Sequence, residues 1–248
     1  MIVPALVEMR QIAKTFGPVV ALNGVDFTVH SDEVVGLVGD NGAGKSTLMK
    51  ILTGVHQPDA GEVWLAGTRV RFHSPLESRR NGIEMVYQDL GLAENLNAIA
   101  NIFLGREVTH RTGGLRLLSE GEMERQGRGH LDGLQISLPS VFLPVERLSG
   151  GQRQSVAIAR ATAFRAQLVI MDEPAASLAV TEATKVLALI KRLREQGVSV
   201  VLISHRLQDV FDVSDRIVVL NRGSKVGDLR RQDTTMEDVV GLIVGKSA

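Results

Sequence analysis

A glycine-rich segment that ends in a lysine and two hydroxyl residues is the part of this sequence best suited to chemistry. It follows the apolar run Val34 to Val38 and reads Gly39-Asp40-Asn41-Gly42-Ala43-Gly44-Lys45-Ser46-Thr47. Glycines at this spacing let backbone N–H groups turn inward around a phosphate, and a helix that follows adds its positive end. Lys45 would contact the β- and γ-phosphates, and the Ser46 hydroxyl would bind Mg²⁺. The alternative is a plain glycine turn; between a strand and a helix, the pattern predicts ATP or GTP binding.

Two acidic residues end a second apolar run. Asp172 and Glu173 follow Leu168 to Met171, which has the pattern of a buried strand. An aspartate at the carboxyl end of a parallel strand beside a phosphate loop suits Mg²⁺ ligation. Glu173, one residue further, would polarise a water for attack on the γ-phosphate. The alternative is a solvated strand end, where Asp and Glu are common.

A second glycine-rich segment opens another expected helix. Ser149 precedes Gly150, Gly151 and Gln152. A serine cap followed by two glycines exposes backbone N–H groups and so makes an anion site. The phosphate loop already surrounds the nucleotide of its own chain, so this second site is free to face a γ-phosphate held by another subunit. An ordinary N-capped amphipathic helix is the alternative.

Buried strands that alternate with helices must position these segments. This rhythm predicts an α/β fold with a mainly parallel sheet, the core of a P-loop NTPase. Residues 1–33 and 59–73 are expected to form an antiparallel β layer. The expected strands are Val34–Val38, Glu62–Leu65, Ile83–Tyr87, Leu168–Met171, Val198–Ile203 and Arg216–Leu220, and the expected helices are Lys45–Gly54, Leu118–Leu134, Gln152–Arg165, Thr181–Gln196 and Leu207–Val213.

The middle of the chain departs from this rhythm. From Asp89 to Arg147 there is almost no strand signal, and Gly105 to Gly114 has the composition of a Gly/Arg-rich loop. We therefore expect residues 1–248 to form one domain, with a helical subdomain inserted at about residues 89–165. Internal repeats and long linkers are not evident in the sequence.

Composition narrows the class of protein. Of the 248 residues, 44% are hydrophobic and 23% charged, as in ordinary globular proteins. Lys+Arg and Asp+Glu each count 28, so no net charge attracts nucleic acid over the whole field. Cysteine is absent, which excludes disulfides and thiolate metal sites. Because no signal peptide is recognisable and the apolar runs fall far short of about 20 residues, we expect a chain that is neither exported nor membrane-spanning.

The second glycine segment also carries a family resemblance. Leu148-Ser149-Gly150-Gly151-Gln152 resembles the signature motif of the ATP-binding cassette (ABC) ATPases, and it lies in the expected order between the phosphate loop and the acidic strand. The resemblance covers essentially the whole chain. It implies ATP and Mg²⁺ as cofactors and a second cassette as partner, either an identical or a sister chain. Two cassettes would meet head to tail, each signature completing the other's ATP site.

The same resemblance implies roles for three further residues. Gln88 would sense Mg²⁺ and the attacking water, His205 would contact the γ-phosphate and hold Glu173, and Phe16 would stack on adenine. A polar strand end, a helix cap and a core phenylalanine are the respective alternatives. Ala179 departs from the family, because many members have an aspartate there that communicates across the dimer. The departure puts a cross-dimer hydrogen bond in question.

Three features favour a membrane transporter as the assembly in which this cassette works. The insert between Gln88 and Leu148 is too short for the coiled-coil arms of DNA-repair cassettes, no basic block is present for RNA, and one cassette occurs without a membrane span. The residues of four segments narrow the type of transporter further. The segments similar to those of monosaccharide importers, such as those for ribose, xylose or fructose, are Asn41–Leu48, Leu52–Gly61, Val86–Leu90 and Phe103–Glu107.

This similarity implies the ATP-hydrolysing subunit of a bacterial importer, peripheral on the cytoplasmic face of the membrane. Its expected partners are permease subunits and, indirectly, a solute-binding protein, with no nucleic acid. Three alternatives remain open: a soluble ABC-type ATPase acting on nucleic acid or ribosomes, a transporter ATPase for a non-sugar substrate, and a non-hydrolysing module gated by ATP.

The phosphate loop yields a direct prediction. Lys45→Ala should lose nucleotide affinity, because it removes the cation that would contact the β- and γ-phosphates. Titration with a fluorescent ATP analogue measures the change. Unchanged affinity would contradict the interpretation of this segment as a phosphate loop.

Overall fold

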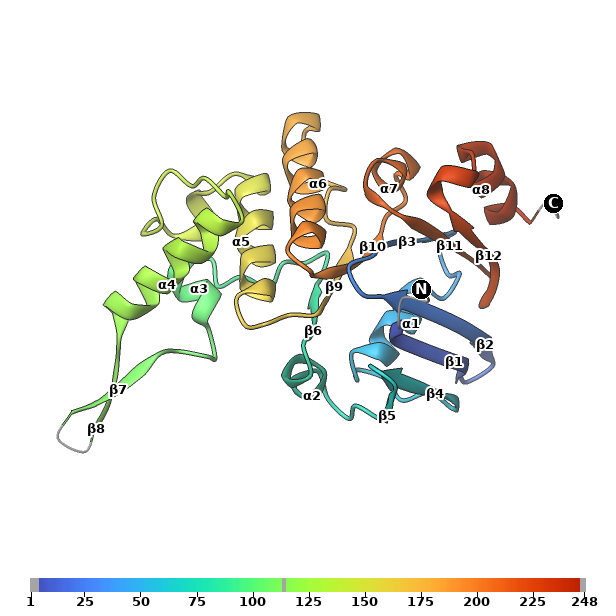
Figure 1. Cartoon of the computed structure of the whole chain (residues 1–248), viewed down its shortest axis with the longest axis horizontal. Helices are drawn as coiled ribbons and strands as arrows, with labels where there is room; N and C mark the ends of the chain where they lie inside the picture. Colours follow the sequence, from blue (N-terminus) through green and yellow to red (C-terminus); the bar gives the residue numbers. More distant parts are fainter. Residues whose placement is uncertain (1–4, 113–114, 246–248) are drawn as a thin grey trace.

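The computed structural model describes residues 5–112 and 115–245, and its largest sheet confirms the expected α/β fold (Figure 1). The order of this six-stranded sheet is β12-β11-β3-β10-β9-β6. All neighbours run parallel except β12, which lies antiparallel to β11. The strands are β3 (Val34–Gly39), β6 (Ile83–Val86), β9 (Leu168–Asp172), β10 (Ser199–Ile203), β11 (Arg216–Asn221) and β12 (Ser224–Arg230).

A second, antiparallel sheet confirms the β layer expected from residues 1–33 and 59–73. Its order is β2-β1-β4-β5, with β1 (Ala5–Phe16), β2 (Val19–His30), β4 (Ala60–Leu65) and β5 (Thr68–Val70). Alternate residues of β3 serve the two sides of the main sheet. Val35 and Leu37 pack with this layer and α1, whereas Val34 and Val38 belong to the core cluster that includes α5, α6 and α7. Burial on both faces explains why β3 is apolar throughout.

Helices follow the strands around the main sheet. They are α1 (Lys45–Leu52), α2 (Pro75–Arg80), α3 (Ala98–Phe103), α4 (Glu120–Gly133), α5 (Gly150–Thr162), α6 (Val180–Glu195), α7 (Leu207–Val213) and α8 (Met236–Ile243), with short 3₁₀ turns at Val145–Arg147 and Arg231–Asp233. Figure 1 shows α3, α4 and α5 grouped at one end of the molecule, beyond β6. In the described part of the chain, no helix combines the length and apolarity that crossing a membrane requires.

One expectation about the middle of the chain is wrong. The segment read as a Gly/Arg-rich loop contains an antiparallel hairpin, β7 (Thr109–Thr112) and β8 (Leu115–Leu118). Gly113 and Gly114 lie outside the described residues. Because β8 takes Leu118, helix α4 begins at Glu120 and not at Leu118. Two short runs around Gly-Gly are typical of a hairpin, but these strands lack the polar–apolar alternation that identifies a half-buried strand.

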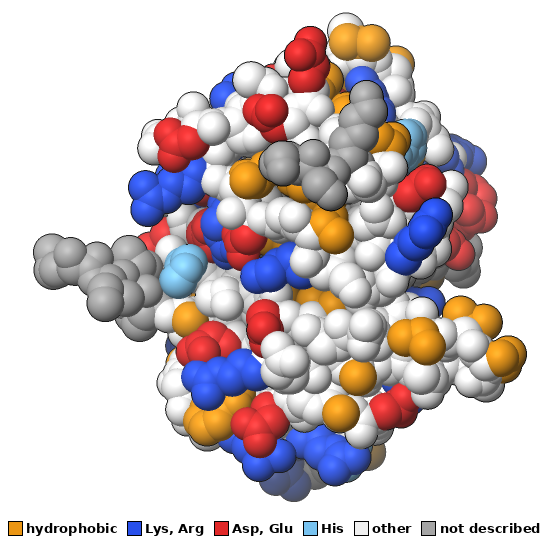
Figure 2. Space-filling model, turned by 90° about the vertical axis from the view of Figure 1, so that its right-hand side faces the viewer, with side chains coloured by type: hydrophobic (Ala, Val, Ile, Leu, Met, Phe, Trp, Pro, Cys, Tyr) orange, Lys and Arg blue, Asp and Glu red, His pale blue; other side chains and the backbone are white. Residues whose placement is uncertain are grey.

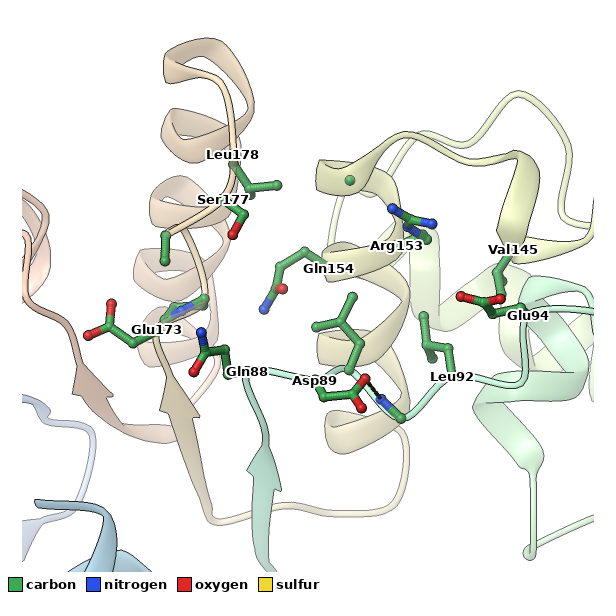
Figure 3. A pocket seen from close by; sticks show the side chains of 15 residues that line it. Gln88, Asp89, Leu92, Glu94, Val145, Arg153, Gln154, Glu173, Ser177 and Leu178 are labelled. Carbon is green, nitrogen blue, oxygen red and sulfur yellow. Dashed lines mark hydrogen bonds between the residues drawn. The ribbon is translucent and has the colours of Figure 1, made fainter.

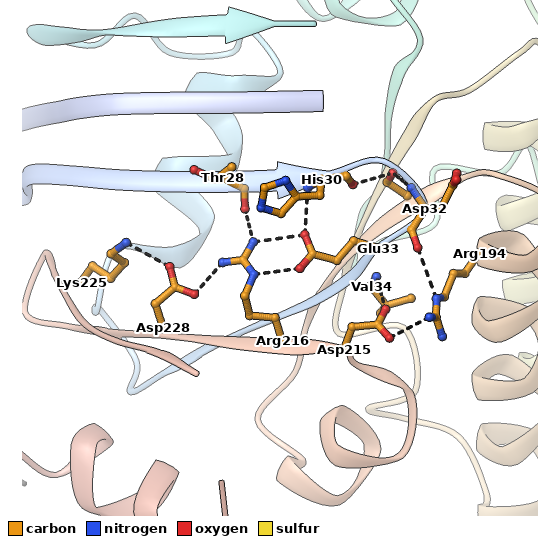
Figure 4. Close-up of polar contacts among 11 residues, drawn as sticks. Thr28, His30, Asp32, Glu33, Val34, Arg194, Asp215, Arg216, Lys225 and Asp228 are labelled. Atoms are coloured by element: carbon orange, nitrogen blue, oxygen red, sulfur yellow. Dashed lines mark hydrogen bonds and ion pairs between the residues drawn. The ribbon is translucent and has the colours of Figure 1, made fainter. Parts of the chain in front are cut away.

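A partly buried ion cluster ties the two sheets together at the amino ends of the parallel strands (Figure 4). The Arg216 guanidinium lies 2.8 Å from Glu33 Oε1 and 2.6 Å from Asp228 Oδ1, and it donates to the Thr28 carbonyl at 2.5 Å. Burial alone would raise the pKa of Asp228, but the hydrogen bond from Arg216 holds that pKa below its usual value. One side chain of β11 thus joins β2, β3 and β12.

Removing the guanidinium should therefore destabilise the protein. Arg216→Ala should lower the free energy of unfolding by about 2 kcal/mol, because it leaves the part-buried Glu33 carboxylate without its cation and Asp228 with Lys225 alone. Urea unfolding followed by circular dichroism measures the loss. Arg69→Ala, which removes an exposed partner of Glu62, is the matched control and should cost less than about 1 kcal/mol. Equal losses in the two variants would contradict a special role for the cluster.

Candidate nucleotide site

The phosphate loop connects the end of β3 to the start of α1, as its sequence predicts. Gly44 is the N-cap of α1 and has a φ of +103°, and a Cβ there would lie 2.6 Å from the Ala21 carbonyl oxygen. A Cβ on Gly39 would lie 2.2 Å from the Leu220 carbonyl oxygen. Only glycine fits these two positions. The first N–H groups of a helix lack partners within it, so those of α1 remain available to a phosphate.

A cavity of about 400 Å³ lies against this loop. It brings together most of the residues singled out in the sequence around the phosphate loop and the acidic strand end. Its lining comprises Asn41, Gly42, Ala43, Gly44, Lys45, Ser46, Thr47, Gln88, Asp172 and Glu173, together with Val19, Val20, Ala21 and Ile203. The Lys45 ammonium donates hydrogen bonds to the carbonyl oxygens of Gly39 at 2.7 Å and Asp40 at 2.9 Å.

The lining of the cavity includes one cationic side chain, Lys45, and two carboxylates, Asp172 and Glu173. Burial lowers the pKa of Lys45, while Glu173, Asp172 and Asp40 act to raise it. Burial also raises the pKa of Asp172, and the neighbouring charge of Glu173 raises it further. A divalent cation would relieve this concentration of carboxylates. Ser46, Asp172 and Gln88 offer the hydroxyl, carboxylate and amide oxygens that Mg²⁺ prefers.

The donor set fits a cation held partly by its substrate. Among the described residues, no cluster of three or more His, Cys, Asp or Glu side chains could enclose a metal by itself. Mg²⁺ is usually bound by one or two protein groups together with substrate phosphates and waters. The residues present therefore fit a nucleotide-bound Mg²⁺ and not an independent metal centre.

Glu173 and His205 contact each other at the ends of adjacent strands. Glu173 has a φ of +53°, uncommon for a residue with a side chain, and its N–H donates to the Ile203 carbonyl at 2.9 Å. The His205 N–H donates to Glu173 Oε1 at 2.9 Å, and its ring Nδ1 lies 2.8 Å from Glu173 Oε2. The backbone N–H and the ring of His205 thus both hold the Glu173 carboxylate, the candidate base.

Gln88 lies between this site and a second hollow (Figure 3). That cavity, of about 330 Å³, separates the ends of β6 and β9 from helix α5 and includes Arg153, Gln154 and Leu178 in its lining. Gln88 and Glu173 line both cavities. If α5 moved relative to the sheet, Gln88 and Glu173 would be the side chains through which the movement could affect the phosphate cavity.

The signature residues form a capped helix start, as expected. Ser149 Oγ accepts the Gln152 N–H at 3.3 Å, and Gln152 Oε1 accepts the Ser149 N–H at 3.0 Å. A Cβ on Gly151 would lie 2.9 Å from the Cβ of Glu182, so this glycine also permits α6 to approach α5. None of the signature residues lines the cavity of the phosphate loop. One chain does not bring the two anion sites together.

Phe16 ends β1 outside both cavities. Its side chain is 43% exposed, which excludes a core role, and its ring meets His56 edge-on with centroids 5.3 Å apart. The Lys14 ammonium lies 5.5 Å from the centre of the same ring. An exposed ring is available for stacking on a base.

Sequence reasoning missed two residues beside His205. Arg206 donates to the Ala175 carbonyl at 3.4 Å, and its Nε lies 3.4 Å from Asp209 Oδ2. Asp209 is only 4% exposed, and burial raises its pKa while Arg206 opposes the rise. The segment after Glu173 is thus tied to α7. An aspartate at the fourth position after His205, in a short helix, was the available signal.

Ala179 is the N-cap of α6 and provides no side-chain hydrogen bond to that helix. Its backbone has the extended conformation, with φ of −62° and ψ of 154°, that an aspartate cap adopts. The departure from the family pattern therefore removes a cap as well as the expected cross-dimer group.

Comparisons with known proteins decide the family. The model of the ABC transporter family matches residues 22–176. The chain is 46% identical over 238 residues to the xylose/arabinose import ATP-binding protein XylG of Sulfolobus acidocaldarius, covering 96% of this chain and 93% of that protein. The chain belongs to the ABC transporter family. The fructose import ATP-binding protein FrcA of Rhizobium meliloti is 43% identical, with coverage of 97% of this chain and 94% of that protein.

Ribose import ATP-binding proteins are matched over part of their length. The chain is 42% identical to RbsA of Geobacillus kaustophilus, covering 97% of this chain but 48% of that protein. This ABC cassette thus spans about half of such relatives.

Solved structures confirm the fold. A nucleotide-free ATP-binding cassette from an ABC transporter has a TM-score of 0.84 at 26% identity, covering 97% of this chain and 99% of that chain. A dimeric post-hydrolysis cassette bound to ADP and Pi has a TM-score of 0.75 at 25% identity, covering 92% and 100% respectively. Together, family and fold confirm that the chain binds ATP.

The fit of glycine at the start of α1 can be tested. Gly44→Ala should lower the free energy of unfolding by about 1–3 kcal/mol, because its φ of +103° and its contact with Ala21 both disfavour a Cβ. It should also weaken ATP binding, measured by titration, by displacing the first N–H groups of α1. Gly129→Ala in α4, where a Cβ meets open space, is the control and should raise stability by up to about 1 kcal/mol. Identical effects of the two substitutions would rule this explanation out.

Proposed function

We propose that this chain is the ATP-hydrolysing subunit of an importer that takes up a monosaccharide. The observation that carries the proposal is the identity of 46% and 43% to sugar import ATP-binding proteins that it matches over nearly their full length. The proposal extends the family assignment to a substrate class. The detailed sugar depends on other subunits.

The site supports hydrolysis by in-line attack of water on the γ-phosphate. Lys45 and the N–H groups at the start of α1 would bind the phosphates and stabilise charge on them. Glu173 would orient the water and accept its proton at a carboxylate oxygen, while His205 holds that carboxylate in place. Mg²⁺, when bound through Ser46, Asp172 and Gln88, would supply positive charge to the phosphate oxygens.

A second cassette would complete the site. Ser149, Gly150 and Gly151 lie away from the phosphate cavity of their own chain, and the capped start of α5 suits an anion. We place the γ-phosphate between the phosphate loop of one chain and the signature of its mate. Loss of that phosphoryl group would then release the dimer.

The partners follow from the importer assignment. Permease subunits would receive the closure of the dimer through the helical subdomain, at about residues 89–165, with Gln88 as the link. The chain would lie on the cytoplasmic face of the membrane, and a solute-binding protein would act on the permease from the other side. Co-purification with permease subunits encoded beside it, followed by uptake of labelled ribose, xylose and fructose in vesicles, tests these assignments.

Action on nucleic acid receives less support. Figure 2 shows acidic and basic side chains interspersed with hydrophobic ones on the face beside α8, with no broad basic surface there. Nucleic-acid binding depends on clustered Lys and Arg that displace counterions from phosphates. The non-hydrolysing alternative is disfavoured by the contact between Glu173 and His205.

The proposed base gives the sharpest prediction. Glu173→Gln should bind ATP and dimerise but hydrolyse it roughly 100- to 10,000-fold more slowly, because an amide accepts no proton. Phosphate release measures the rate, and light scattering with Mg·ATP measures the dimer. Glu195→Gln, at the exposed end of α6, should keep the wild-type rate. Wild-type turnover in Glu173→Gln would overturn the assignment of the base.

A further inference from the structure

The hairpin β7–β8 is a surface element that the nucleotide chemistry does not use. It leaves the helical group between α3 and α4, and Figure 1 shows it projecting away from the rest of the molecule. A two-stranded hairpin by itself is at best marginally stable in water. Its projection from the rest of the molecule leaves it open to a partner outside this chain.

The hairpin combines exposed leucines with positive charge. Leu115, Leu117 and Leu118 are 68%, 46% and 53% exposed. Between Val108 and Ser119 the sequence contains arginine and histidine but no acidic residue. Single exposed leucines are ordinary, but here Leu115 and Leu117 share one face of the hairpin and Leu118 lies on the other, so the projection presents apolar side chains on both faces.

The register of the hairpin places like charges together. Arg111 lies directly opposite Arg116, and the alternation of the strands puts Leu115 and Leu117 on the other face. Like charges directly across a strand pair are destabilising. Within the described ranges, neither arginine forms an ion pair, although Arg125 and Arg128 of the next helix both do. The arrangement suits an external anion that accepts both guanidinium groups.

We propose that this hairpin docks on the anionic lipid surface of the membrane beside the permease. This inference rests on the proposed function, which places the chain at the cytoplasmic face. Leu115 and Leu117 would enter the boundary between headgroups and acyl chains. Arg111 and Arg116 are long enough to reach lipid phosphates from the opposite face of the hairpin.

Charge favours lipid over the permease as the occupant. Cytoplasmic loops of membrane proteins carry an excess of Lys and Arg, which would repel Arg111 and Arg116. The cytoplasmic leaflet has the opposite sign, because its lipids are partly anionic. The hairpin would then add a weak second attachment to the one that the permease supplies, and two linked attachments bind more tightly than either alone.

Vesicle binding by the full chain tests this proposal without any permease. The purified protein is mixed with vesicles of phosphatidylcholine alone or with one part in three of phosphatidylglycerol, and bound protein is separated by flotation. We expect binding to the anionic vesicles only, weakening with salt. Arg111→Gln with Arg116→Gln should reduce it about 25-fold, since each basic residue near such a surface contributes about fivefold. Leu115→Ser with Leu117→Ser should also reduce it.

Matched controls separate the hairpin from net charge. Arg125→Gln with Arg128→Gln removes the same charge from α4 of the same helical group and should leave vesicle binding within about twofold of wild type. ATP hydrolysis should be unchanged in all three double variants, because none touches the nucleotide cavity. Equal loss in the α4 control would overturn the proposal, as would anionic vesicles that fail to bind the wild type.

The outcome is distinguishable from failure of the proposed function. If vesicle binding is absent but the chain still co-purifies with the permease, only the lipid proposal is wrong. If the hairpin variants lose the permease and not the vesicles, the occupant is the permease and the lipid proposal is likewise overturned. If the chain binds no permease at all, the importer assignment fails whatever the vesicles show.

Discussion

Parallel strand pairing is the constraint on which the site depends. Strands β3, β10 and β9 are neighbours that run in one direction, so their carboxyl ends meet at a single edge of the sheet. Lys45 follows the first of these strands, His205 the second and Glu173 the third. No long side chain has to span the molecule, because topology alone places the three groups together. Ligands in open α/β sheets bind at this edge for the same reason.

The edge is also where the helical group can influence chemistry. Gln88 follows β6, the parallel strand at one side of the sheet, and the chain beyond it passes to α3 and α4. Its side chain borders both the phosphate cavity and the hollow beneath α5. At the opposite edge, Arg216 holds the amino ends of the strands through Glu33 and Asp228. One end of the sheet is therefore fixed by partly buried ion pairs, while the other carries the side chains that line the phosphate cavity.

Much of this arrangement could be predicted from the sequence, because local patterns determine it. The strands around Val34 and Leu168 are apolar on both faces, which marks them as buried. At positions such as Gly44 a Cβ does not fit, so glycine is required there. The hairpin at 109–118 was missed because its exposed faces lack the polar–apolar alternation that burial imposes. The tie between Arg206 and Ala175 could not be predicted, since it joins segments whose distance only the packing of α7 sets. Phe16 lies outside the cavity, so its predicted stacking on adenine does not follow from the geometry of the phosphate loop.

Two chemically different groups of His205 contact the Glu173 carboxylate. One comes from an imidazole, whereas the other comes from the main-chain N–H of the same residue, which every amino acid except proline supplies. The backbone contact to the carboxylate is therefore independent of which side chain occupies position 205, unless that residue is proline. The orientation of the proposed base is in this sense set in part by the path of the backbone, and only the second contact depends on the imidazole.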